Sequence, residues 1–136
     1  MSMNLMRKLT GGAIVLMAFV FISFTQDDGD WEVPSKYLKM ENPTEDNARN
    51  LKIGKALYSK HCKSCHGNQG LGDGPKAASL ETFSGDFSSE EFQSQFDGAL
   101  YYKTTFGKGE MPAFDKSISS DEDRWLIVRY MRTFAK

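Results

Sequence analysis

Cys62-Lys63-Ser64-Cys65-His66 is the stretch that decides the fold of this 136-residue chain. It has the form C-x-x-C-H, with two thiols separated by two residues and an imidazole directly after them. This spacing is typical of c-type haem attachment. The thiols can reach the vinyl groups on two adjacent pyrroles, and the histidine then projects beneath the ring, where it can bind iron. We therefore predict one covalent haem c, attached through Cys62 and Cys65, with His66 as an axial iron ligand.

Closely spaced cysteines also occur in zinc sites and in thiol–disulfide enzymes. A structural zinc site takes four ligands from separated segments, whereas every cysteine and histidine of this chain lies between His61 and His66. A thiol–disulfide oxidoreductase places C-x-x-C after a strand of a βαβ unit, and no alternating strand pattern of useful length is present. A disulfide between two such close cysteines would be strained. The pattern favours haem attachment, with zinc binding and thiol redox chemistry as the alternatives.

Haem iron that is bound by one histidine either takes a second ligand or stays open, and the candidates for a second ligand are the other histidine and the methionines. His61 lies on the attachment side of the ring and is predicted to be a surface or haem-edge residue. Met131 falls on the apolar face of the last helix, and Met40 lies in a proline-containing arm. Met111 stands in Gly107-Lys108-Gly109-Glu110-Met111-Pro112, where glycines let the chain pass close over a flat ring and proline fixes the loop. We predict Met111 as the second ligand, because a sulfur ligand raises the reduction potential and suits an electron carrier.

Helices flank this region on both sides. One helix is expected to begin after Pro43, with Thr44 as its N-cap and acidic residues in its first turn, and to run into the C-x-x-C-H motif. The last helix is expected to follow Ser119, which forms a capping-box pattern with Glu122. A shorter helix is expected near Asp97. The connecting segments are rich in glycine and serine. The predicted fold is all-α, with about three to four helices around one haem and an extended arm before them.

The first 26 residues differ from the rest of the chain. Arg7 and Lys8 precede an uncharged run over residues 9–26, which is the pattern of a secretory signal. The run is just shorter than the ~20 residues that span a bilayer. Residues 1–25 are therefore predicted to be a signal peptide or an N-terminal membrane anchor, the latter associating with the membrane through residues 9–26. In either case the protein is expected in the periplasm or on the periplasmic face of the inner membrane.

Residues 26–43 contain two prolines and no sustained periodicity, which predicts an extended arm. Its apolar residues are expected to lie in surface grooves of the following domain or to dock onto another subunit; they are Trp31, Tyr37, Leu38 and Met40. The whole chain has 17 Lys+Arg against 18 Asp+Glu, a net charge of −1, which argues against nucleic acid as a partner. Its 2 cysteines exclude a disulfide-rich scaffold.

Residues 44–136 resemble a class I cytochrome c domain. The motifs come in the same order, namely a helix, C-x-x-C-H, a Gly-Pro loop, a Met-Pro loop and a C-terminal helix. The resemblance implies that a small and an aromatic residue on the first helix meet partners on the last helix, where the glycine permits a close crossing. These four residues are Gly54, Tyr58, Ile127 and Tyr130.

The loop Gly72-Asp73-Gly74-Pro75 resembles the family's loop beside the ligand histidine. The resemblance implies that the carbonyl of Pro75 accepts a hydrogen bond from the imidazole N–H of His66. Such a contact fixes the tautomer and the orientation of a ligand histidine and tunes the metal. Pro75 is therefore a candidate residue of the haem site.

The chain is similar, more closely, to the small monohaem c subunits of membrane respiratory assemblies such as alternative complex III, a quinol:electron-acceptor oxidoreductase. The shared stretches are Gly67–Pro75, Phe96–Tyr102, Arg124–Arg132 and the arm with Trp31 and Pro34. This implies electron transfer through one His/Met-ligated haem c, with respiratory subunits as partners and no small-molecule substrate. The alternatives are a free periplasmic shuttle to an oxidase or reductase, and a haem peroxidase or gas sensor with an open iron site.

Overall fold

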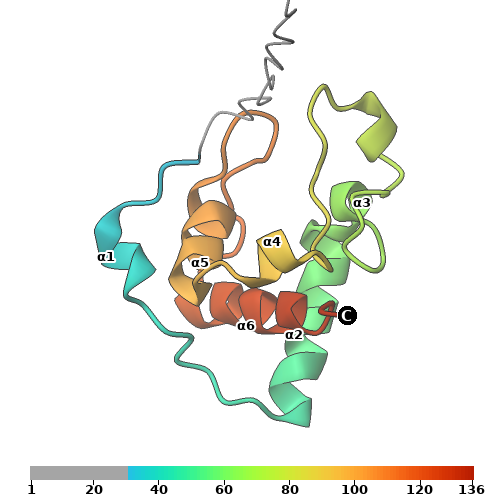
Figure 1. Cartoon of the computed structure of the whole chain (residues 1–136). Coiled ribbons are helices and arrows are strands. Elements are labelled where there is room, and N and C mark those ends of the chain that lie inside the picture. The colour runs from blue at the N-terminus through green and yellow to red at the C-terminus, as the bar shows by residue number, and fades with distance from the viewer. Residues whose placement is uncertain (1–30) are drawn as a thin grey trace, which may run out of the picture.

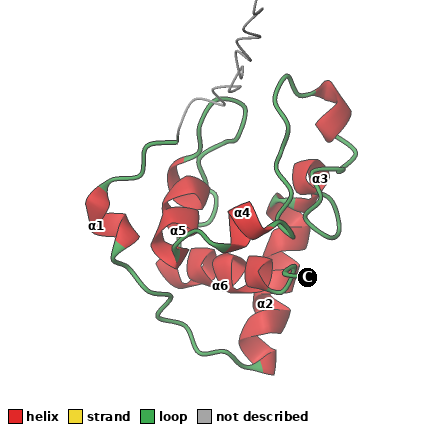
Figure 2. Cartoon of the chain, viewed as in Figure 1, coloured by secondary structure: helices red, strands yellow, loops and turns green. Residues whose placement is uncertain are grey.

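The computed structural model describes residues 31–136, so the predicted export segment 1–25 lies outside the described residues. Over residues 31–136 the chain forms helices and no strand (Figure 2). The helices are α1 Ser35–Leu38, α2 Ala48–His61, α3 Lys63–His66, α4 Glu90–Gln93, α5 Asp97–Phe106 and α6 Asp121–Arg132, with a 3₁₀ turn η1 at Ala77–Ser79. This confirms the all-α prediction, and the one-turn helices α1, α3 and α4 account for the larger number. None of the helices in this range is long and apolar enough to cross a membrane.

Helices α2 and α6 cross closely and form the framework of the fold (Figure 1). They meet at Gly54, where an added Cβ would overlap the carbonyl oxygen of Leu126 and lie 3.0 Å from the Cβ of Tyr130. One turn further along α2, the ring centroids of Tyr58 and Tyr130 are 5.4 Å apart, and Ile127 is fully buried. The close crossing implied by the resemblance is therefore confirmed, and it depends on the absence of a side chain at Gly54.

The start of α2 corrects the prediction that Thr44 caps it. The N-cap is Asn47, whose side-chain oxygen accepts a hydrogen bond of 2.9 Å from the backbone N–H of Asn50. The hydroxyl of Thr44 instead accepts a hydrogen bond of 2.9 Å from Nε of Arg129 and donates one of 2.7 Å to Oδ1 of Asn42. Threonine is a favourable N-cap residue, but the hydroxyl of Thr44 is hydrogen-bonded to Arg129 on α6 and does not cap α2.

Helix α6 also begins one residue later than the predicted cap. Ser120, rather than Ser119, is the N-cap, and its hydroxyl accepts a hydrogen bond of 3.2 Å from the N–H of Asp123. The apolar face of α6 is buried as predicted, and the predicted short helix near Asp97 is α5. The buried core consists of Tyr58, Cys62, Phe87, Leu100, Tyr101, Phe114, Ile118, Trp125, Ile127, Val128 and Met131.

Within the segment before α2, residues 35–38 form α1 rather than extended chain, and α1 packs against α5 (Figure 1). The ring centroid of Tyr37 lies 4.8 Å from that of Tyr102. Gly98 allows the close approach, because an added Cβ would overlap the Tyr37 carbonyl, and its N–H donates a hydrogen bond of 3.2 Å to the carbonyl of Met40. Tyr37 thus lies against the domain as expected, whereas the side chains of Leu38 and Met40 are 37% and 38% exposed.

Candidate functional site

The loop joining η1 to α4 and the loop joining α5 to α6 both line a cavity of about 450 Å³. Cofactor pockets are typically roughly 300–1,000 Å³. Four of the predicted site residues line this cavity, namely Cys62, Cys65, His66 and Met111. The fold therefore brings the C-x-x-C-H motif and the distant Met-Pro loop to the same cavity.

The end of α2 and the single turn α3 set the geometry of the cysteines and the histidine. The carbonyl of Cys62 accepts hydrogen bonds from the backbone N–H groups of Cys65 at 3.2 Å and His66 at 3.0 Å. Positions three and four residues apart share one face of a helical turn, so all three side chains line the cavity. Both thiols are free. Burial, and secondarily Cys65, raises the pKa of the Cys62 thiol to about 12, so this thiol is protonated at neutral pH.

Tyr58 links the helix crossing to the turn that follows the histidine. Its buried hydroxyl donates a hydrogen bond of 2.9 Å to the carbonyl of Gly67, and burial raises the pKa of Tyr58, which keeps it a neutral donor. Gly67 ends α3 with φ at +82°, a conformation that favours glycine. The residue next to His66 is therefore fixed by α2, and a shift of the α2–α6 crossing would be transmitted to the imidazole.

The imidazole of His66 packs against one aromatic ring. Its ring centroid lies 4.5 Å from that of Phe87, which itself stacks on Phe92 at 4.2 Å. Burial lowers the pKa of His66, and the smaller effect of the Ser84 backbone opposes this shift. The buried Nδ1 atom has no hydrogen-bond partner among the described residues, so the contact with the Pro75 carbonyl stays a prediction. The imidazole is thus kept neutral, the form that binds metals.

Met111 is carried by a tight turn. Lys108 and Met111 exchange two backbone hydrogen bonds of 3.0 Å each. Gly107 and Gly109 have φ values of +61° and +57°, which a side chain would strain. An added Cβ at Gly107 would also collide with the backbone of Met111 and Pro112. The glycines and the proline therefore hold the half-buried Met111 on the cavity wall.

Trp31 is a cavity residue that the sequence did not identify as part of the site. Its ring lines the cavity, and the Nζ atom of Lys103 on α5 lies 5.6 Å from the ring centroid. The buried ring of Phe114 also lines the cavity, with its centroid 6.0 Å from that of His61, which places His61 at the cavity edge. Trp31 was expected to dock because it is an aromatic residue in a polar arm. The local sequence does not indicate the surface on which it docks.

Glu110 is a second cavity residue that the sequence did not identify. It lines the cavity beside Met111 and accepts hydrogen bonds from the backbone N–H groups of Glu81 and Thr82 in the opposite loop. These hydrogen bonds lower the pKa of Glu110, so it is a carboxylate at neutral pH. Its position directly before the predicted ligand Met111 places it near the site, but nothing in the sequence indicates its contact with the opposite loop.

The donors on the cavity wall fit a haem c. Two thiols at C-x-x-C spacing, the adjacent imidazole and a thioether from another loop are the attachment points and axial ligands that such a group takes. The neutral imidazole of His66 is available to iron. The described part of the chain has no ligand set for zinc, because no three of its His, Cys, Asp or Glu side chains are arranged to hold a metal ion. Thiol–disulfide chemistry lacks its strand context across residues 31–136.

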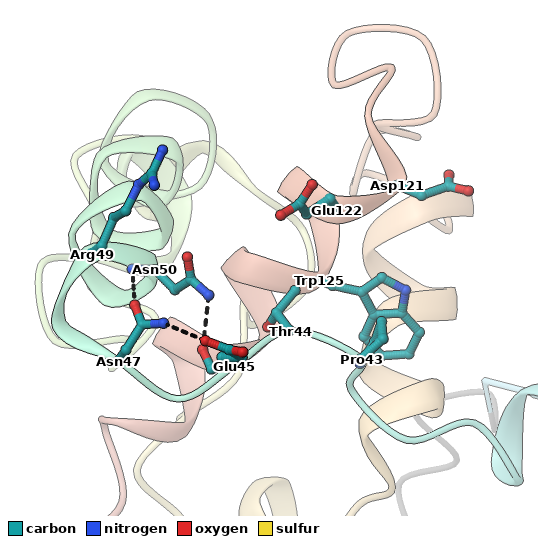
Figure 3. Close-up of a pocket in the computed structure, with 9 residues that line it drawn as sticks. All are labelled: Pro43, Thr44, Glu45, Asn47, Arg49, Asn50, Asp121, Glu122 and Trp125. Carbon is teal, nitrogen blue, oxygen red and sulfur yellow. Dashed lines mark hydrogen bonds between the residues drawn. The ribbon is translucent and has the colours of Figure 1, made fainter.

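A second cavity, of about 660 Å³, lies where the start of α2 approaches the start of α6 (Figure 3). Its wall is tied together by hydrogen bonds from the Asn47 side chain to Glu45 at 3.2 Å and from the Asn50 side chain to the Glu45 carbonyl at 2.9 Å. No cysteine, histidine or methionine lines it, so it offers no haem ligand. Its lining consists of Pro43, Thr44, Glu45, Asn47, Arg49, Asn50, Asp121, Glu122 and Trp125.

Comparisons with known sequences point in the same direction as the cavity. The sequence model of the family described as cytochrome C oxidase, cbb3-type, subunit III matches residues 49–131. The matched span contains both the C-x-x-C-H motif and Met111. Cytochrome c6 of Chlorolobion braunii is 35% identical over 77 residues, which cover 53% of this chain and 78% of that protein.

Two solved structures resemble the fold. A chain of the Kuenenia stuttgartiensis reducing HAO-like protein complex superposes with a TM-score of 0.62 at 30% identity, covering 69% of this chain. The match spans 47% of that chain, about half of its length. The c-type cytochrome KustC0563 gives a TM-score of 0.52 at 28% identity, covering 61% of this chain and 98% of that one.

Proposed function

The chain belongs to the family described as cytochrome C oxidase, cbb3-type, subunit III, and we propose that this cytochrome c carries electrons through one haem held by Cys62, Cys65, His66 and Met111. Electron transfer with a covalently bound haem c is what the family and its relatives indicate. One observation carries the residue assignment. The four side chains line a single cavity although Met111 comes from a loop far along the chain.

Each of the four residues has a distinct role in this proposal. When bound, the haem supplies a one-electron couple between ferric and ferrous iron. Cys62 and Cys65 would hold it through thioethers, and His66, kept neutral by burial, would bind the iron from one side. The sulfur of Met111 would bind from the other side and raise the reduction potential. Because His66 and Met111 would then both be iron ligands, the proposed role is that of an electron carrier rather than an enzyme.

Electrons are proposed to enter and leave at the cavity mouth. Three exposed lysines, Lys63, Lys108 and Lys116, belong to the segments that carry the motif and the Met-Pro loop, and Lys108 lines the cavity. Lysines around a redox centre raise the encounter rate with an acidic partner and make that rate fall with ionic strength. We therefore expect the redox partner to present an acidic surface to this mouth.

We further propose that the protein is an exported subunit of a membrane respiratory assembly similar to alternative complex III. The support is the resemblance of its loops and arm to such subunits. Residues 9–26 would attach it to the membrane, with the domain on the periplasmic face of the inner membrane. A free periplasmic shuttle to an oxidase or reductase is the alternative use of the same site.

Gentle extraction of native membranes distinguishes the two settings. We expect the cytochrome to stay with the membrane after a salt wash and, in mild detergent, to co-elute with larger redox subunits on size-exclusion chromatography. The mass of the purified chain reports whether residues 1–25 remain. Release by salt alone as a soluble monomer would contradict the subunit proposal and favour the free shuttle.

Cysteine replacement tests the covalent attachment. After co-expression with a c-type maturation system, the wild-type chain is expected to hold about one haem that resists acid–acetone extraction, as its single C-x-x-C-H motif predicts. Loss of Cys62 or Cys65 to serine should leave a single thioether, and the double variant should release all haem. Ser64→Ala, between the two cysteines, is the matched control and should keep the wild-type content. Covalent haem in the double variant would refute the assignment.

A further inference from the structure

The carboxylate of Glu110 joins the two loops that form the walls of the cavity. Its Oε2 atom accepts hydrogen bonds from the backbone N–H of Glu81 at 2.9 Å, from the backbone N–H of Thr82 at 3.0 Å and from the Thr82 hydroxyl at 3.0 Å. Its Oε1 atom accepts a further one from the N–H of Glu81 at 3.1 Å. Hydrogen bonds to a charged acceptor are about twice as strong as neutral ones. The contact therefore ties the loop after α5 to the loop after η1.

This contact is made one residue before the proposed iron ligand. Glu110 and Met111 both belong to the tight turn that the two hydrogen bonds between Lys108 and Met111 close. Such a turn has little freedom of its own, so restraining Glu110 also restrains Met111. Thr82, on the other side of the connection, lines the same cavity. The loop that carries Met111 is thus attached, through Glu110, to the loop that carries Glu81 and Thr82.

We propose that Glu110 is a positioning residue, whose carboxylate holds the Met-Pro loop against Glu81 and Thr82 and so keeps Met111 on the iron. The inference rests on the proposed role of Met111 as axial ligand and adds a reason why that ligand stays in place. Without the contact the loop swings away more often, and external ligands reach the iron at a higher rate. Glu110 itself makes no contact with the iron.

The test is the rate at which imidazole binds to the ferric holoprotein. Glu110→Ala is expected to accelerate binding by about tenfold or more, because it removes every charged hydrogen bond of the contact. Glu110→Gln, which keeps an acceptor oxygen without the charge, should lie between Glu110→Ala and the wild type. Thr82→Val removes the hydroxyl alone and should give a smaller increase. If Glu110→Ala reduces the yield of holoprotein, the imidazole-binding rates of Glu110→Gln and Thr82→Val provide the test instead.

The matched control is Glu81→Gln. It removes one negative charge from an exposed side chain in the same region and leaves the backbone N–H of residue 81 in place. Its imidazole-binding rate is expected to equal that of the wild type. Covalent haem content and far-ultraviolet circular dichroism, measured in parallel, separate a loosened ligand from a damaged fold.

The outcomes distinguish the positioning role from the ligand assignment. If Met111→Ala opens the iron but Glu110→Ala behaves like Glu81→Gln, the positioning role is wrong and the ligand assignment stands. If the wild type binds imidazole as fast as Met111→Ala does, Met111 is not the ligand and the proposed site itself fails. Rapid imidazole binding in Glu110→Ala, with an intermediate rate in Glu110→Gln, supports both the positioning role of Glu110 and the assignment of Met111 as iron ligand.

Discussion

Met111→Ala is expected to leave the haem covalently attached, to lower its reduction potential and to open the iron to external ligands. The Met111 sulfur raises the potential as an axial ligand, and alanine has no atom that can replace it. Because axial ligands tune haem potentials over about 0.8 V, we expect a fall on the order of 0.1 V or more. A redox titration measures the fall, and carbon monoxide binding to the ferrous protein measures the opening.

Two other methionines serve as controls. Met40 in the arm is 38% exposed and does not line the cavity, so Met40→Ala is expected to keep the wild-type potential. Met131 is 5% exposed in the core, and Met131→Ala is expected to cost about 2–5 kcal/mol of unfolding free energy without opening the iron. If Met111→Ala keeps the wild-type potential and binds no carbon monoxide, the axial assignment is wrong.

The same variant separates an electron carrier from a peroxidase or gas sensor. In a carrier, the wild type is low-spin, shows the weak ferric band near the red end of the spectrum and acquires an open coordination position only in Met111→Ala. A peroxidase or sensor would show a high-spin spectrum and ready ligand binding before any substitution. The contrast between wild type and variant is therefore more informative than either spectrum alone.

The cavity donors were predictable because most of their chemistry is local in the sequence. C-x-x-C-H places three donors in one helical turn, and the glycines around Met111 indicate a loop that passes close to a flat group. The fold adds that all four side chains line one cavity. Trp31 and Glu110 were not predictable, because Lys103 and the Glu81–Thr82 backbone lie far from them in the chain. Periodicity and spacing carry no information about such contacts.

The helix starts show how tertiary contacts decide between equally good caps. Both Thr44 and Asn47 favour an N-cap position, but the hydroxyl of Thr44 is bound by Arg129 on α6. At α6 the chain is held just before the cap, since Ile118 is buried and its carbonyl accepts a hydrogen bond from Arg124. The presence of each helix follows from its apolar face, whereas its first residue depends on these longer-range contacts.

Gly54→Ala is expected to destabilise the protein, although alanine is the better helix former. Within a helix, glycine-to-alanine replacement normally stabilises by about 1 kcal/mol. At Gly54 the new Cβ would overlap the carbonyl oxygen of Leu126 and lie 3.0 Å from its carbonyl carbon. These are backbone atoms of α6, so the two helices must move apart. Overpacking of this kind costs about 1–3 kcal/mol, which reverses the sign set by helix propensity.

The sign of the change is therefore the decisive result. Gly54→Leu adds far more volume at the same crossing and should destabilise the protein further. Overpacked cores lose about 1–3 kcal/mol and occasionally more, so we expect a loss at the upper end of this range. Urea unfolding of the ferric holoprotein measures each free energy. Ala56→Leu, on the exposed side of α2, is the control and should change stability by no more than about 0.5 kcal/mol. A Gly54→Ala protein at least as stable as the wild type would mean that helix propensity offsets or outweighs the clash with the α6 backbone.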